Sequence, residues 1–63
     1  LEKLNKLLGE LPIKQREVFL LRHFEGMNYS EISKVTGKTE GSLKANYHHA
    51  INKILKRMNY EVY

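Results

Sequence analysis

Between Leu43 and Met58 the apolar residues recur at steps of three and four positions, the spacing that gathers side chains on one side of an α-helix. The apolar members are Leu43, Tyr47, Ala50, Ile51, Ile54, Leu55 and Met58. The other side is small, polar and basic, and it carries Gly41, Ala45, His48, His49, Asn52 and Lys56. Because Thr39 is a good helix cap, we expect a helix from Thr39 to about Arg57, the longest in the chain.

A short helix ending in a glycine turn precedes this long helix. Asn28 followed by Glu31 is a capping-box pattern, which predicts a helix start, and Gly37 is a typical helix stop. Ser33 lies four residues before Gly37 and Leu43 lies six after it, a spacing typical of the helix-turn-helix unit. An ordinary bundle of three or four helices is the alternative. We expect one core that contains Ile32, Val35, Leu43, Tyr47 and Ile51.

The first third of the chain predicts two more helices. Leucines recur at the same helical spacing through residues 1–11. After Pro12, residues 13–24 contain no glycine or proline that would interrupt a helix. The second run has a wide apolar side, so we expect it in the middle of the fold: Ile13, Val18, Leu20, Leu21 and Phe24. No strand pattern occurs, so the predicted fold is an all-α, small helix-turn-helix domain of three to four helices. We expect residues 1–63 to be one domain of a longer protein, with residues 1–10 ending a linker helix and residues 59–63 forming a tail.

Several classes of protein are excluded by composition. The chain has 63 residues and no cysteine, which rules out disulfides and thiolate metal sites. Its longest apolar run, Val18 to Leu21, is far shorter than the ~20 residues of a membrane helix. A chain of this length can bury only a thin core, which leaves little room for a catalytic cleft of roughly 300 Å³. No nucleophile motif is present. His48 and His49 are adjacent, so on a helix they diverge by about 100° and make a poor metal site. We therefore expect no enzyme, metal, cofactor, small-molecule substrate or membrane.

Positive charge is concentrated in the second half of the chain. Residues 1–31 hold five lysines and arginines against five glutamates, whereas residues 32–63 hold six against two. The whole net charge of +4 therefore lies in the half that contains the long helix. A basic helix is what binding to a polyanion requires, because each neutralised phosphate releases condensed counterions. A solvated lysine face that serves solubility is the alternative.

Three separated motifs resemble, in order, conserved region 4 of bacterial RNA polymerase sigma factors, in particular those of the extracytoplasmic-function type. The motifs are Leu11-Pro12 with Arg16-Glu17-Val18-Phe19, then Glu25-Gly26 with Tyr29, Glu31 and Ile32, and finally Gly37 with Gly41 and Lys44. Residues 11–58 would form the sigma region 4-like part of the chain. The resemblance implies that the last helix recognises the minus-35 element of double-stranded promoter DNA. It also implies docking on the β-subunit flap of RNA polymerase core, an anti-sigma factor as a further partner, and a cytoplasmic location.

The resemblance assigns roles to particular residues. The positions that face the base edges in the family are Lys44, Ala45, His48 and His49. The positions beside phosphates are Thr39, Gly41 and Ser42, with Arg22 and Lys34 as clamps on the DNA backbone. Two arginines usual in the family are missing, because Asn46 and His49 stand in their places. We therefore expect weaker non-specific DNA binding and a shallower salt dependence than is typical.

Two other functions are compatible with the sequence. The output domain of a two-component or quorum-type regulator shares a four-helix version of this unit, although it usually opens with a different motif. A sigma-like module with weakened DNA binding could instead mainly bind proteins. The residues available to such a partner are Leu1, Leu4, Leu8, Tyr60 and Tyr63.

Overall fold

The computed structural model describes the backbone of residues 2–62 and the side chains of residues 2–58. Within this part of the chain every regular element is helical, so the all-α prediction is confirmed. The elements are α1 (Glu2–Glu10), α2 (Ile13–Phe19), the π-helical segment η1 (Leu20–Phe24), α3 (Tyr29–Thr36) and α4 (Glu40–Val62). None of the helices within the described residues is long and apolar enough to span a membrane.

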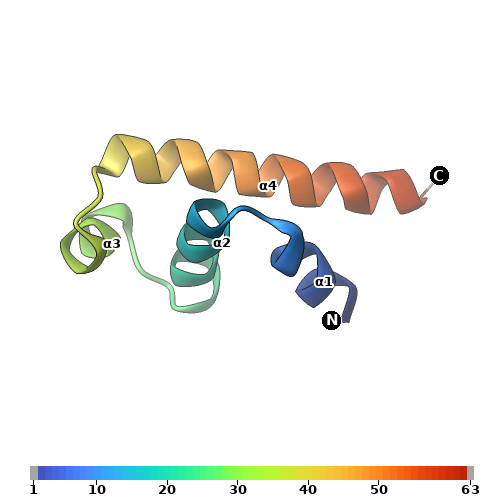
Figure 1. Cartoon of the computed structure of the whole chain (residues 1–63), viewed down its shortest axis with the longest axis horizontal. Coiled ribbons are helices and arrows are strands. Elements are labelled where there is room, and N and C mark those ends of the chain that lie inside the picture. The colour runs from blue at the N-terminus through green and yellow to red at the C-terminus, as the bar shows by residue number, and fades with distance from the viewer. Residues whose placement is uncertain (1, 63) are drawn as a thin grey trace.

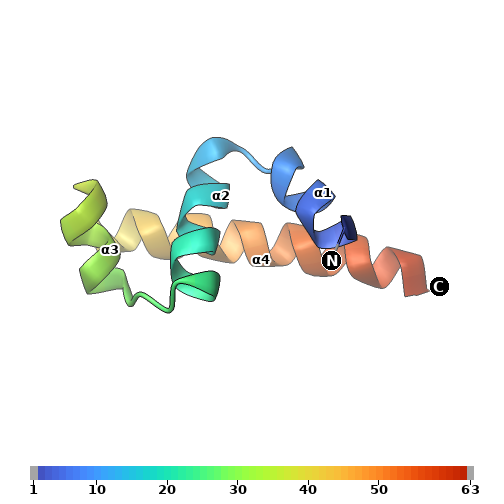
Figure 2. The same ribbon diagram turned by 90° about the horizontal axis from the view of Figure 1, so that it is seen from below.

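The long helix α4 organises the molecule, because the shorter helices all lie along one side of it (Figure 1). α3 lies beside its N-terminal end, α2 beside its middle and α1 beside its C-terminal half (Figures 1 and 2). The prediction of its start is confirmed: the Ser42 amide donates to Thr39 Oγ1 at 3.2 Å, which makes Thr39 the cap. Its other end extends past Arg57 to Val62. The side of α4 that faces away from the short helices is left open (Figure 1).

Two small clusters of buried side chains replace the single core that we expected. One cluster contains Leu8, Leu11, Phe19, Ala50 and Ile54, with Leu4, Tyr47 and Ile51 packed against it. The other contains Val18, Ile32 and Leu43, with Leu21, Met27, Tyr29 and Tyr47 packed against it. Ile32 and Leu43 are thus confirmed as buried, while Ile51 lies beside the first cluster and Tyr47 touches both. Tyr47 is the side chain that joins the two clusters.

The predicted burial of Val35 is wrong. Its side chain is 70% exposed, whereas Ile32 on the same short helix is 0% exposed. The inward line of α3 runs from Ile32 to Thr36, which are four positions apart and therefore point the same way. α3 is also the outermost of the short helices along α4 (Figure 1), and Val35 belongs to neither buried cluster.

The run 13–24 is helical as predicted, but its hydrogen bonding changes partway. In η1 the Glu25 amide donates to the Leu20 carbonyl oxygen at 3.2 Å, one residue further back than in an α-helix. This wider turn ends at Gly26, whose φ of 70° lies in the left-handed region that glycine tolerates best. Within η1 the apolar side chains of Leu20 and Phe24 are exposed, whereas Leu21 packs against the second cluster.

The predicted apolar side of this helix is therefore wrong for three of its members. Ile13, Leu20 and Phe24 are 70%, 38% and 54% exposed. Val18 is buried as expected, and so is its neighbour Phe19, which lies in the other cluster. Adjacent helical residues point about 100° apart, so this pair lets α2 pack on two sides at once. The central position that we expected for this helix is confirmed (Figure 1).

The start and the end of α3 are those predicted from the sequence. The Asn28 amide donates to Glu31 Oε1 at 2.9 Å and the Glu31 amide donates to Asn28 Oδ1 at 2.8 Å, which completes the capping box. Gly37 follows the last turn with a φ of 76°, and its amide donates to the Ser33 carbonyl oxygen at 2.8 Å. The glycine turn thus places α3 and α4 as the two helices of the predicted motif.

Candidate nucleic-acid interface

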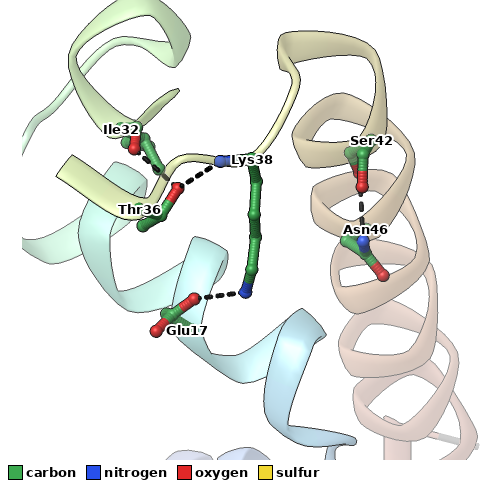
Figure 3. A network of polar contacts seen from close by, with 6 residues as sticks. All are labelled: Glu17, Ile32, Thr36, Lys38, Ser42 and Asn46. Carbon is green, nitrogen blue, oxygen red and sulfur yellow. Dashed lines mark hydrogen bonds and ion pairs between the residues drawn. The ribbon is translucent and has the colours of Figure 1, made fainter. Parts of the chain in front are cut away.

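The turn between α3 and α4 is fixed by side chains as well as by Gly37 (Figure 3). Thr36 Oγ1 donates to the Ile32 carbonyl oxygen at 2.8 Å and accepts from the Lys38 amide at 3.2 Å. Ser33 Oγ donates to the Lys38 carbonyl oxygen at 2.6 Å, so the small residue of the motif also bonds the turn. These contacts restrict the direction in which α4 leaves the turn.

An ion pair ties the same turn to α2. Lys38 Nζ lies 2.7 Å from Glu17 Oε1 (Figure 3). This ion pair was not predicted from the sequence. Glu17 and Lys38 lie 21 positions apart along the chain, so no local sequence pattern indicates the ion pair. Because both side chains are partly exposed, the pair adds little stability by itself. Its consequence is geometric, since it holds the start of α4 against the central helix.

The outer face of α4 carries most of the predicted DNA-binding residues. The exposed residues at its start are Thr39, Gly41, Ser42, Lys44, Ala45, His48 and His49. On the opposite side of the helix Leu43, Ala50 and Ile54 are buried. The predicted division of this helix into a packed side and an open side is therefore confirmed for these residues, but it is wrong for Leu55 and Met58, which are 52% and 40% exposed. The open side has short side chains at Gly41 and Ala45, which lets a helix backbone approach another surface closely.

Asn46, one of the two replacements for a family arginine, is turned onto its own helix. Its Nδ2 donates to the Ser42 carbonyl oxygen at 3.0 Å, and the side chain is half-buried (Figure 3). An amide held in this way is less available to a ligand than a long, free guanidinium. His49, the other replacement, is exposed on the open face.

Arg22 lies next to the outer face, whereas Lys34 does not join it. The Arg22 guanidinium lies 4.5 Å from the ring centre of Tyr29 and 5.7 Å from that of Tyr47. Its Nη1 donates to the Met27 carbonyl oxygen at 3.3 Å. Arg22 lines a shallow hollow in the surface, whereas Lys34 is exposed on α3 and does not line it.

Arg22 forms part of a shallow hollow between η1, α3 and α4. The hollow is lined by Arg22, His23, Tyr29, Lys44, Tyr47 and His48. Lys44 Nζ lies 5.7 Å from the Tyr29 ring centre, so two cations approach the same ring. None of these six described side chains carries a carboxylate. The structure therefore brings three of the predicted site residues together with three that were not predicted, His23, Tyr29 and Tyr47.

A second concave surface lies between α1 and the C-terminal half of α4. Its lining comprises Lys3, Lys6, Leu7, Glu10, Leu11, Lys53, Ile54, Lys56 and Arg57. The leucines and Ile54 are buried and form its floor, and the basic residues form its rim. Arg57 forms an ion pair with Glu10, which links the two helices. We call this surface the α1–α4 groove.

Among the described residues no three His, Cys, Asp or Glu side chains lie close enough together to hold a metal ion. The structure instead presents an exposed, basic helix that follows a glycine turn. Beside this helix lies the hollow that contains Arg22 and Lys44, which we call the cationic hollow. A fold and a surface of this kind define the helix-turn-helix class of DNA-binding domains.

Comparison with known families gives a more specific assignment. Residues 1–54 match the family described as Sigma-70, region 4, and the chain belongs to that family. It is also 35% identical over 52 residues to the proteins named ECF RNA polymerase sigma factor SigD from Mycobacterium tuberculosis and Mycobacterium bovis. The match covers 82% of this chain and 24% of those relatives, so the chain spans about a quarter of their length. No solved structure matches significantly.

The family assignment confirms the resemblance drawn from the motifs. The chain is a DNA-binding domain of the sigma-factor type, similar to extracytoplasmic-function members, and its family works in transcription initiation with RNA polymerase. The members of this family are regulatory DNA-binding domains, and the family is not a class of enzyme. The match also places the chain with the sigma factors rather than with the output domains of two-component or quorum-type regulators.

Proposed function

We propose that the chain recognises the minus-35 promoter element by inserting the outer face of α4 into the major groove. The observation that supports this most directly is the exposure of Gly41, Lys44, Ala45, His48 and His49 along one open face, in a family that binds DNA. An α-helix fits the major groove, where each base pair presents a distinct set of donors and acceptors. Lys44, Ala45, His48 and His49 are the proposed contacts to base edges.

The proposed phosphate contacts flank this face. Thr39, Gly41 and Ser42 lie at the N-terminus of α4, where backbone amides and the helix dipole favour an anion. Glu40 lies in the same turn and opposes this effect. On the other flank, Arg22 lies with Lys44 and His48 in the cationic hollow, which supports its proposed role as a clamp on the DNA backbone. The proposed role of Lys34 has only its exposure and charge to support it.

Lys44→Ala tests this proposal. We expect weaker binding to every duplex and a decrease of about 0.9 in the slope of log K against log salt, because one phosphate contact is lost. The measurement is fluorescence anisotropy with a labelled duplex at several salt concentrations. Lys6→Ala removes the same charge from an exposed position on α1 and should leave the slope unchanged. An unchanged slope in Lys44→Ala would place Lys44 outside the interface.

We also propose that the α1–α4 groove receives the β-subunit flap of RNA polymerase core. A promoter-binding domain must hold polymerase and DNA together, so the two surfaces have to be separate. The groove satisfies this condition, because its residues on α4 begin at Lys53, after the proposed DNA contacts end at His49. Its buried floor and basic rim suit an acidic, amphipathic segment. An anti-sigma factor would act by covering this groove, and a polymerase partner places the protein in the cytoplasm.

Lys53→Glu tests the polymerase surface separately from DNA binding. We expect about tenfold weaker binding to RNA polymerase core in the absence of DNA, because the substitution puts a like charge opposite an acidic segment. Lys14→Glu makes the same change at an exposed position on α2 outside the groove and is the control. If both variants bind core polymerase as the parent does, the flap contacts another surface.

The alternative that this chain mainly binds proteins is less well supported by the structure than by the sequence. Leu8 is buried in a core cluster and Leu4 packs against that cluster, so these leucines stabilise the fold and are not open to a partner. Leu1 and Tyr63 lie outside the described residues, as does the side chain of Tyr60.

A further inference from the structure

We propose that His23 is an additional contact to a DNA phosphate, and that His23 and His48 together make DNA binding by this chain depend on pH. The inference rests on the proposed function, because the phosphate belongs to a DNA duplex held by α4. Neither the sequence motifs nor the roles carried over from the family assign any role to His23. Its place in the cationic hollow is what the structure adds.

The ring of His23 packs against other aromatic rings although it is exposed. It stacks on Phe19, with ring centres 5.0 Å apart and an angle of 17° between the planes. It also meets Phe24 edge to face, with ring centres 5.0 Å apart and an angle of 88°. Phe19 in turn stacks on Tyr47 at 6.0 Å, so a row of rings joins His23 to α4. An exposed side chain that is oriented in this way loses less conformational freedom when it binds a ligand.

His48 lines the same hollow from α4. It follows Tyr47 directly, and the centres of the two rings are 6.3 Å apart. The two histidines thus come from different elements, η1 and α4, and border one concave surface. A phosphate bound there would contact both helices of the DNA-binding unit and the segment before them.

The surroundings of the hollow favour an anion. The charged groups that face it are Arg22 from η1 and Lys44 from α4, and the other titratable groups are Tyr29 from α3 and Tyr47 from α4. The carboxylate of Glu17, on the neighbouring α2, is paired with Lys38. Arg22 is half-buried, and its guanidinium contacts two aromatic rings and a carbonyl oxygen. A partly desolvated cation of this kind gains from an anionic ligand.

Protonation of the two histidines would add two positive charges to this surface. Histidine changes its charge between pH 5 and pH 8, so acidification increases the attraction for phosphate. Proton binding and DNA binding are linked, and each must strengthen the other by the same factor. The parent chain should therefore bind duplex DNA more tightly at about pH 5.5 than at about pH 7.5 and should take up protons when it binds.

The test compares single histidine variants of the 63-residue chain at constant salt. Fluorescence anisotropy with a short DNA duplex gives the affinity of the parent, His23→Gln, His48→Gln and Lys14→Gln from about pH 5.5 to pH 8. His49 is itself a proposed base contact, so the control is Lys14→Gln, which makes a glutamine at an exposed position of α2 outside the hollow. We expect His23→Gln and His48→Gln each to reduce the dependence on pH, and Lys14→Gln to keep it. The salt slope of the parent should steepen on acidification by about 0.9 for each histidine that becomes a phosphate contact.

A positive control and a fold control complete the experiment. His23→Arg keeps a charge at every pH, so it should bind at about pH 7.5 more tightly than the parent and depend less on pH. Thermal melting by circular dichroism checks that loss of the stack on Phe19 leaves the variants folded. If the parent binds duplex DNA but His23→Gln keeps its full dependence on pH, the inference is wrong. If the parent binds no duplex at any pH, it is the proposed function that fails.

Discussion

Ile32→Ala is expected to lower the free energy of unfolding by about 2–5 kcal/mol, which is a large part of the stability of so small a domain. Ile32 is 0% exposed and packs with Val18 and Leu43, one residue from each of the two helices that α3 must hold. Shortening the side chain removes contacts to both helices and leaves a cavity. Thermal and urea denaturation followed by circular dichroism measure the change.

Val35→Ala is the matched control, because it shortens a branched side chain on the same short helix. Val35 is 70% exposed, so the expected change is within about 0.5 kcal/mol. The pair distinguishes a packed side chain from a solvated one only three positions away. Equal losses of stability in the two variants would contradict the packing of α3 described above.

His49→Arg is expected to restore a preference for guanine at one position of the bound DNA. Arginine offers a fork of donors to guanine O6 and N7, and one good bidentate pair discriminates against the wrong base by about 1–3 kcal/mol. His49 is exposed on the open face of α4, at a position where the motif resemblance implies an arginine. The measurement is selection from a pool of randomised duplexes, with the sequences enriched by the parent and by the variant compared base by base.

The control for this experiment adds the same charge elsewhere. Asn5→Arg places an arginine on the exposed side of α1, where it should tighten binding slightly for all sequences and enrich no base. If His49→Arg also enriches no base, α4 does not present this position to the groove. The proposal that the chain reads a sequence through this face would then have to be abandoned.

The parts of the fold that local patterns determine were predictable from the sequence. The capping box at Asn28 and Glu31, the left-handed Gly37 and the periodicity of the long helix each depend on residues a few positions apart. The same holds for the open face of α4, because helical spacing alone separates Gly41, Ala45 and His48 from Leu43. Such features require no knowledge of which helices pack together.

The features that were missed depend on contacts between distant segments. Helical spacing made Val35 look buried, but its exposure follows from the outlying position of α3 along α4. The change to π-helical geometry after Phe19, which turns Leu20 and Phe24 to solvent, has no marker in the sequence. The cationic hollow combines η1, α3 and α4, so His23 could be connected with His48 only once these elements were placed.

The unbroken course of α4 has a mechanical consequence. From Glu40 to Val62 there is no hinge, so the surface proposed for DNA and the groove proposed for polymerase are two ends of one rod. Each residue along such a rod advances by about 1.5 Å and turns by about 100°, which fixes the angular phase between the ends. Adding or removing one residue between Ala50 and Lys53 would therefore turn one surface by about 100° relative to the other.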